Sequence, residues 1–188
     1  MARTSESDWL KSGLAILRDG GEVALTIERL CSELSRTKGA FYHHFRDVDV
    51  YLHALLTRWE HEQTAQPIEQ ANAVGPSERR RALDSAVHAL DMKLDLAVRA
   101  WGLRDPVARK FVARVDQRRV AYLTELFDPG LPVRQRRTLA RLEYVAFLGA
   151  QQFFHDFKAP AARETQRTLH AAMAALLDNG AKRRRRER

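Results

Sequence analysis

A short stretch of the sequence, residues 34–47, combines hydrogen-bond donors with aromatic side chains in a way that suits neither a buried helix nor a solvated one. Its side chains with donor groups are Thr37, Lys38, Tyr42, His43 and His44. Such hydroxyl, ammonium and imidazole groups can donate to phosphate oxygens, and a helix N-terminus adds free N–H groups that attract anions. The stretch therefore points to an anionic partner outside the protein.

Two short helices in succession are predicted to hold these groups in place. Apolar residues recur with helical spacing after Thr26, which suits an N-cap, and a second N-cap, Thr37, follows soon afterwards. Phe41 and Phe45 are four residues apart and are expected to face inward, which leaves the polar groups outside. Short, tightly joined helices are typical of a helix-turn-helix unit, whose second helix enters the major groove of DNA.

The predicted DNA-binding residues belong to the first cap, the turn and the second helix. Gly39 has no side chain, so protein backbone and DNA backbone can approach closely there. The full set is Thr26, Arg36, Thr37, Lys38, Gly39, Ala40, Tyr42, His43 and His44. The plain alternative for the Tyr-His-His group is a helix end whose polar side chains are simply solvated.

The stretch LTIERLCSELSRTKGAFYHHFRDVDVYL, residues 25–52, resembles the helix-turn-helix signature of the TetR family of bacterial transcription regulators. The residues that carry the resemblance are Thr26, Thr37, Gly39, Tyr42, His44 and Phe45. The resemblance implies a homodimer whose last two helices pair in a four-helix interface. It also implies a repressor that binds a palindromic double-stranded DNA operator and is released when a small-molecule effector fills a pocket in the C-terminal domain.

Three positions depart from the pattern of that family. Ser35 stands at the turn where the family usually has Gly, so a left-handed backbone there would cost about 1 kcal/mol more than with Gly. Arg36 replaces an apolar residue, and either lays its stem over the core or reaches a phosphate. Val48 and Asp49 stand where a Lys-Glu pair is common, and Arg36 and Arg46 are candidates to replace the missing cation.

Helical periodicity continues through the rest of the chain, and no segment shows the alternation of a strand, so the fold is predicted to be all-α. We expect an N-terminal three-helix helix-turn-helix domain at residues 1–47. A helical ligand-binding and dimerisation domain is expected at residues 48–181. The basic residues 182–188 are expected to form a disordered tail.

Proline, glycine and polar caps set the predicted limits of the later helices. One helix is expected to begin after Asp47 and to end before Pro67. A single long helix is then expected from about Pro76, capped by Ser77, to Gly102. The remaining helices are predicted at residues 106–127, 133–156 and 160–178.

Aromatic and polar residues of the regulatory part are candidates to line the ligand pocket, although aromatic stripes on helices more often form core. The candidates are Met92, Trp101, Tyr122, Tyr144, Phe147 and Gln151. The small residues Ala146, Gly149 and Ala150 let another helix come close, which suits either an interior helix or a dimer interface.

The formal net charge of +8 is unevenly distributed along the chain. Residues 1–50 hold 7 Lys and Arg against 8 Asp and Glu, whereas residues 182–188 hold 6 against 1. The predicted DNA-binding segment is therefore nearly neutral. Its affinity for DNA has to come from local geometry and not from the overall charge.

Cysteine content and hydropathy indicate the compartment. Cys31, the single cysteine, lies in an apolar helical run and is expected to pack as a small hydrophobic residue. The sequence has no export signal and no apolar stretch of about 18 residues, so a soluble cytoplasmic protein with no membrane partner is expected.

Catalysis and metal binding are not expected. The sequence has no Gly-rich phosphate loop, nucleophile elbow, HExxH or paired-carboxylate motif, so it predicts neither an enzyme nor a cofactor. The spacing of His43, His44, His53 and His61 does not put three imidazoles on one helical face. The alternatives that stay open are a helical protein-interaction module and a transcriptional activator without small-molecule induction.

Overall fold

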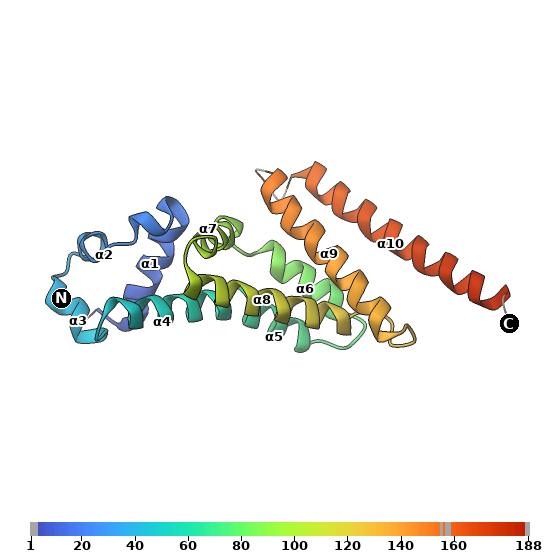
Figure 1. Ribbon diagram of the computed structural model, residues 1–188, viewed down its shortest axis with the longest axis horizontal. Helices are drawn as coiled ribbons and strands as arrows, with labels where there is room; N and C mark the ends of the chain where they lie inside the picture. Colours follow the sequence, from blue (N-terminus) through green and yellow to red (C-terminus); the bar gives the residue numbers. More distant parts are fainter. Residues whose placement is uncertain (1–3, 155, 157–158, 187–188) are drawn as a thin grey trace. The chain divides into compact units, whose positions relative to one another are not determined.

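Every regular element is a helix in the residues that the structure describes, which are 4–154, 156 and 159–186 (Figure 1). The structure is a computed structural model, and it divides into two compact units, residues 1–119 and 120–188. The predicted all-α class is confirmed. The division between the units differs from the functional domain limits expected at residues 47 and 181, and those limits stay predictions.

The first unit begins with four short elements: α1 (Glu6–Gly20), the 3-10 turn η1 (Glu22–Ala24), α2 (Ile27–Leu34) and α3 (Lys38–His44). A capping box starts α1. The Ser5 hydroxyl accepts the N–H of Asp8, and the Asp8 carboxylate accepts the N–H of Ser5. These local bonds satisfy donors that the first turn of a helix would otherwise leave without a partner.

A close approach between α1 and α4 (Val48–Glu60) requires a glycine. A Cβ atom at Gly13 would lie 1.9 Å from the hydroxyl oxygen of Tyr51. Tyr51 is buried, and its hydroxyl donates to the carbonyl of Trp9 at 3.1 Å. Gly13 therefore makes room for the tyrosine that joins α4 to α1.

A π turn, η2 (His61–Ala65), connects α4 to α5 (Gln66–Asn72), so the helix predicted to end before Pro67 continues past it. Pro67 has no N–H to donate, and in a regular helix its ring would clash with the carbonyl four residues earlier, at Gln63. The wider π turn ends at Ala65, two residues before the proline, and the Gln63 carbonyl accepts an N–H of Arg119 at 2.9 Å. The prediction was wrong because this compensation comes from a distant residue.

The single long helix predicted from Pro76 to Gly102 is two helices, α6 (Arg79–His88) and α7 (Met92–Gly102). Glu78, not Ser77, is the N-cap residue of α6, and no side chain caps it. Asp91 begins α7, since its carboxylate accepts the N–H groups of Lys93 and Leu94.

The next helix, α8 (Pro106–Glu125), begins as predicted after Asp105, whose carboxylate accepts the N–H of Ala108 at 2.7 Å. One core runs through the first unit and joins the short N-terminal helices to α4, α7 and α8. Its members include Trp9, Leu17, Phe41, Phe45, Tyr51, Leu55, Trp59, Val98, Trp101 and Phe111.

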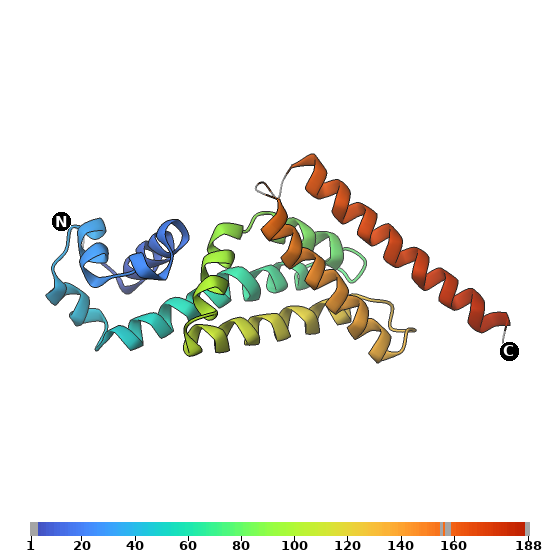
Figure 2. The same cartoon turned by 45° about the horizontal axis from the view of Figure 1, so that its top comes forward.

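The second unit holds the end of α8, then α9 (Val133–Phe153) and α10 (Pro160–Arg186) (Figure 2). The two last helices contact each other, and His170 of α10 lies 3.6 Å from the Glu143 carboxylate of α9. Residues 182–186, part of the basic stretch, are helical here, so the predicted disorder of residues 182–188 stays a prediction. Residues 187 and 188 lie outside the described part of the chain.

Candidate nucleic-acid interface

Both predicted N-caps of the helix-turn-helix unit are confirmed. The Thr26 hydroxyl oxygen accepts the N–H of Arg29 at 3.1 Å, and the Thr37 hydroxyl oxygen accepts the N–H of Ala40 at 3.3 Å. Capping uses a lone pair of the oxygen and leaves the O–H as a donor. Both threonines are exposed, so each can cap its own helix and also donate to a phosphate.

The turn between α2 and α3 depends on Ser35. Its backbone is left-handed, with φ 51° and ψ 50°, and it is the only non-glycine residue with positive φ in the described part of the chain. The N–H of Arg36 then reaches back to the carbonyl of Cys31 at 2.8 Å and closes the end of α2. The turn is therefore left-handed although its residue is not glycine, and only three residues separate the end of α2 from the start of α3.

Inward-facing aromatic residues fix the rotation of α3. Phe41 and Phe45 are almost fully buried, and their rings lie 5.2 and 4.9 Å from the ring of Tyr51. Trp9 meets Phe41 edge to face at 5.5 Å. Because these rings hold one side of α3 against the core, Tyr42, half exposed, points outward.

The predicted DNA-binding residues lie together on adjacent elements. Those with exposed positions are Thr26, Thr37, Lys38, Gly39, Tyr42 and His43, whereas Arg36, Ala40 and His44 are partly buried. A Cβ at Gly39 would meet only Thr37 Oγ1, at an ordinary 3.7 Å. Nothing inside the described fold requires a glycine there, which agrees with close approach by a partner from outside.

Arg36 has a partner within the fold. Its Nε donates to the Thr4 hydroxyl at 2.5 Å, and the bond is partly buried. The contact places the Arg36 guanidinium beside Thr4, near the start of the chain, and both roles expected for Arg36 stay predictions. Arg46, the other candidate cation, is exposed and pairs with Asp47, which also caps α4 by accepting the N–H of Val50.

Lys38 and Glu28 form an ion pair across the two helices. The hydrogen bond from Lys38 holds the pKa of the Glu28 carboxyl below its ordinary value. The same bond raises the pKa of Lys38, so both groups are charged at neutral pH. The cation that begins α3 thus faces a carboxylate from α2.

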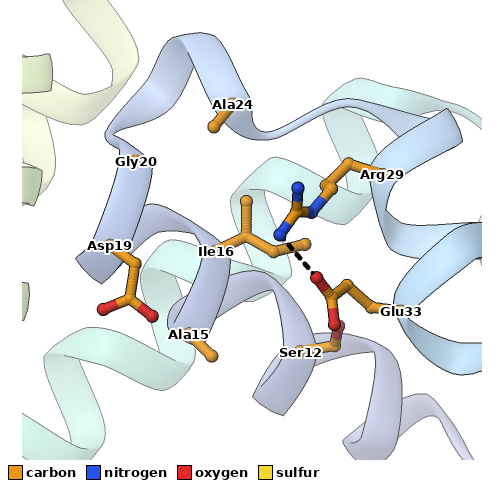
Figure 3. Close-up of a pocket in the computed structure, with 8 residues that line it drawn as sticks. All are labelled: Ser12, Ala15, Ile16, Asp19, Gly20, Ala24, Arg29 and Glu33. Atoms are coloured by element: carbon orange, nitrogen blue, oxygen red, sulfur yellow. Dashed lines mark ion pairs between the residues drawn. The ribbon is translucent and has the colours of Figure 1, made fainter.

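A hollow of about 260 Å³ lies between α1 and α2 (Figure 3). Its lining residues are Ser12, Ala15, Ile16, Asp19, Gly20, Ala24, Arg29 and Glu33. Figure 3 shows Arg29 and Glu33 side by side on one wall, where they form an ion pair of 2.7 Å. Asp19, on another wall, pairs with Arg18. The charged groups of the hollow are thus already paired, and none of the predicted ligand-binding residues lines it.

Those ligand-binding candidates fall in both compact units. Met92 and Trp101 belong to the first unit. The candidates in the second unit are Tyr122, Tyr144, Phe147 and Gln151, and the rings of Tyr144 and Phe147 stack at 6.2 Å. That these six residues line one pocket stays a prediction.

A buried charge network around Asp95 was missed by the sequence analysis. Asp95 accepts from Arg99 at 2.8 Å and from Arg119 at 3.0 Å, and its side chain is 1% exposed. Burial opposes the ionisation of Asp95, but the charges of Arg119 and Arg99 outweigh it and hold its pKa below the ordinary value. Arg119 also donates to the Thr64 hydroxyl at 3.0 Å, which links α7 and α8 to the π turn after α4. The i, i+4 spacing of Asp95 and Arg99 was the available signal.

Two absences concern the described residues only. No group of three or more His, Cys, Asp or Glu side chains there has the arrangement of a metal site. Within that same part of the chain, no helix has the length and apolar character needed to cross a membrane.

Comparisons with known proteins support the fold. No protein-family model matches the sequence, and no curated protein sequence matches it. The structure is similar to that of a proposed transcriptional regulator from Streptomyces coelicolor A3(2), with TM-score 0.64 and 21% identity over 88% of this chain and 94% of the other. It is also similar to a transcriptional regulator from Aquifex aeolicus VF5, with TM-score 0.66 and 12% identity over 91% and 98%. The Aquifex protein is described as a member of the TerR/AcrR family, and the present chain has the fold of these two regulators.

Proposed function

We propose that the chain is a DNA-binding transcription regulator, a repressor that binds a palindromic operator as a homodimer and is released by a small molecule. The observation that carries this proposal is the α2–α3 unit. It has two N-capped helices joined by a left-handed turn, with one side of α3 fixed by Phe41 and Phe45. The opposite side of α3 presents exposed hydrogen-bond donors, and α3 is the second helix of the unit, the one that enters the major groove and reads DNA in a helix-turn-helix protein. The proposed activity is not enzymatic, and its proposed place is the cytoplasm.

The two ends of α3 serve the DNA backbone in this proposal. Thr37 and Lys38 approach a phosphate at the N-terminal end, where the dipole and free N–H groups of the helix also attract the anion. Tyr42 and His44 donate to phosphates farther along the helix. Gly39 and Ala40 let the helix enter the major groove closely enough to meet base edges.

Selection of bound sites from a random duplex library tests the proposal most directly, because it tests DNA binding and yields the operator together. We expect enrichment of a palindrome whose half-sites lie in successive major-groove turns, about 34–36 Å apart or a multiple of that. A footprint on the enriched site separates the regulator from a protein-interaction module. Recovery of no preferred sequence would contradict operator binding.

Exposed apolar residues on α9 support the homodimer. Leu142, Val145, Gly149 and Phe153 recur every three or four residues, and all are exposed. On α10, exposed small residues recur with similar spacing at Ala161, Thr165, Thr168, Ala172 and Ala175. Two such faces suit a four-helix interface between identical copies, since a two-fold axis pairs each face with its own equivalent.

Gly149→Leu tests that interface. A Cβ at Gly149 meets nothing within 4 Å, so a leucine side chain begins in open space and is expected to obstruct a partner helix and not the protomer itself. We expect sedimentation to show a loss of dimer. Gly75→Leu is a matched control, because a Cβ at Gly75 also meets nothing within 4 Å and lies outside α9 and α10. An unperturbed dimer in Gly149→Leu would assign the interface to another surface.

Two buried polar atoms near the junction of α4 and η2 are where the proposal places a contact with the ligand. The indole N–H of Trp59, in α4, and the side-chain oxygen of Gln63, in the π turn η2, are buried without a hydrogen-bond partner in the described part of the protein, and the two residues are four apart in the sequence. A small molecule with one acceptor and one donor would satisfy both. In this proposal, ligand binding there shifts α4 and so changes the spacing of the two reading helices.

Reciprocity tests the ligand response. An effector that lowers DNA affinity tenfold must itself bind about tenfold more weakly to the DNA complex, a coupling of roughly 1.4 kcal/mol. If the effector binds with equal affinity in the presence and absence of operator, release by a small molecule is contradicted, and the chain would be a regulator without induction.

A further inference from the structure

We infer that Glu28 competes with DNA phosphate for Lys38, so that operator binding requires the exchange of one anion for another at the start of α3. The inference rests on the proposed function, since it concerns how the same surface meets DNA. It assigns a regulatory role to an acidic residue outside the predicted DNA-binding set.

The geometry places the competitor where the phosphate is expected. Glu28 lies in the first turn of α2 and Lys38 is the first residue of α3, and the Lys38 ammonium donates to a Glu28 carboxylate oxygen. The side chains are 66% and 59% exposed, so the pair is on the surface and open to a partner. A phosphate that approaches the N-terminal end of α3 therefore meets an ammonium that already has a counter-anion.

Such a pair restrains binding without preventing it. Ion pairs between exposed side chains are weak, because water screens them and two flexible chains must be ordered. A phosphate can therefore displace the carboxylate. The carboxylate nevertheless stays near the displaced position and repels the phosphate, because both groups are negatively charged.

The pairing of neighbouring charges gives this exchange a large share in the DNA affinity of the surface. Arg29 pairs with Glu33 at 2.7 Å and Arg46 pairs with Asp47 at 2.9 Å, so other cations near the reading helix also face carboxylates of the protein. Residues 1–50 hold 7 basic against 8 acidic side chains. A surface with so little net positive charge neutralises few phosphates and so releases few counterions from the DNA, and the pairing of Lys38 therefore matters more than it would on a strongly basic surface.

The test measures the affinity of the full-length chain for its selected operator and for a mixed-sequence duplex, over a range of salt concentrations. Glu28→Gln keeps the shape of the side chain and removes its charge. We expect binding to both duplexes to tighten roughly threefold to tenfold at low salt. The gain should shrink as the salt concentration rises, because salt screens the attraction between Glu28 and Lys38 and the repulsion between Glu28 and the phosphate.

Glu33→Gln is the matched control, because it removes the same charge from the same helix but frees Arg29 in place of Lys38. We expect a clearly smaller gain in affinity than from Glu28→Gln. Equal gains in the two variants would mean that net charge alone is responsible, and would overturn the inference. Thermal unfolding of both variants shows whether α2 is intact.

A double-mutant cycle separates competition from simple repulsion. In a Lys38→Gln background, Glu28→Gln should keep only the part of its gain that comes from repulsion between carboxylate and phosphate, because the cation for which the two anions compete is gone. A full gain in that background would overturn the competition. If the parent chain binds neither duplex at low salt, the proposed function fails and the inference fails with it. If the parent binds and the cycle shows no coupling, only the inference fails.

Discussion

The α2–α3 surface and the network around Asp95 both consist of paired charges, but the pairs differ in exposure. The Lys38–Glu28 pair is more than half exposed on both sides, whereas the Asp95 side chain is 1% exposed. Water can replace the partners of the first pair but not those of the second. The exposed pair is therefore suited to exchange with a ligand, and the buried pair is suited to fix one arrangement of helices.

The position of each network agrees with this difference. Glu28 and Lys38 join two short helices at the proposed DNA surface. Arg119 instead joins Asp95 of α7 to Thr64 and to the Gln63 carbonyl in the π turn that follows α4. The arrangement implies that the path of the chain through the π turn, from α4 to α5, depends on one mostly buried arginine, Arg119.

The largest effect is expected from Asp95→Asn. Removal of this charge leaves Arg99 and Arg119 mostly buried beside an uncharged amide, which destabilises the fold by about 3–5 kcal/mol. Denaturant unfolding measures the loss. The control is Asp116→Asn, since Asp116 also pairs with Arg99 but is 34% exposed, and the expected loss is below about 1 kcal/mol. Similar losses in both variants would show that burial does not distinguish the two carboxylates.

Acid should weaken the fold through the same residue. The pKa of Asp95 is lower in the folded chain than in the unfolded one, so the unfolded state binds a proton first as the pH falls. The stability that Asp95 contributes is thus complete above its unfolded pKa, about 3.9, and is lost as the pH falls through the folded pKa. Unfolding measured between neutral and acidic pH should be less pH-dependent in Asp95→Asn than in the parent. An equal dependence in both chains would assign the acid sensitivity elsewhere.

Lys38→Ala should behave in the opposite way to Asp95→Asn: its DNA affinity should fall, and its stability should not change. Lys38 is exposed and contributes to no core, so its thermal unfolding midpoint should match that of the parent. DNA binding should weaken across sequences, and the salt slope should fall by about 1 if one phosphate contact is lost. Loss confined to one base pair of the operator, with an unchanged slope, would instead make Lys38 a base reader.

Much of the helix-turn-helix unit could be predicted because its signals are local. Thr26, Thr37 and Asp47 each cap a helix through a bond to a backbone N–H three residues later, and sequence spacing reveals such bonds. The inward positions of Phe41 and Phe45 follow from their spacing of four. Predictions based on local caps and periodicity were therefore accurate in this part of the chain.

The later helices were harder to predict because distant partners decide them. Pro67 is tolerated inside a helix because a π turn precedes it and Arg119, 56 residues from Gln63, binds the carbonyl of Gln63. The break at Asp91 lies within a continuous helical pattern of apolar residues, so periodicity alone does not reveal it. Asp95 and Arg119 are 24 residues apart, and only the fold brings them together.

The smallest effect is expected at the turn between α2 and α3, where Ser35 has a left-handed backbone with φ 51°. A side chain in this conformation costs roughly 1–2 kcal/mol, whereas glycine adopts it freely but loses about 0.4–1 kcal/mol through the greater freedom of the unfolded chain. Ser35→Gly should therefore stabilise the chain by about 0.5–1 kcal/mol in denaturant unfolding.

Ser35→Ala is the control for that gain, because alanine keeps the Cβ atom and with it the cost of the left-handed backbone. It should give no increase in stability. Ser35 is exposed and lies outside the Asp95 network, so neither variant should change the acid dependence of unfolding. A loss of stability in Ser35→Gly would contradict the left-handed turn, and with it the close succession of α2 and α3 on which the proposed DNA surface depends.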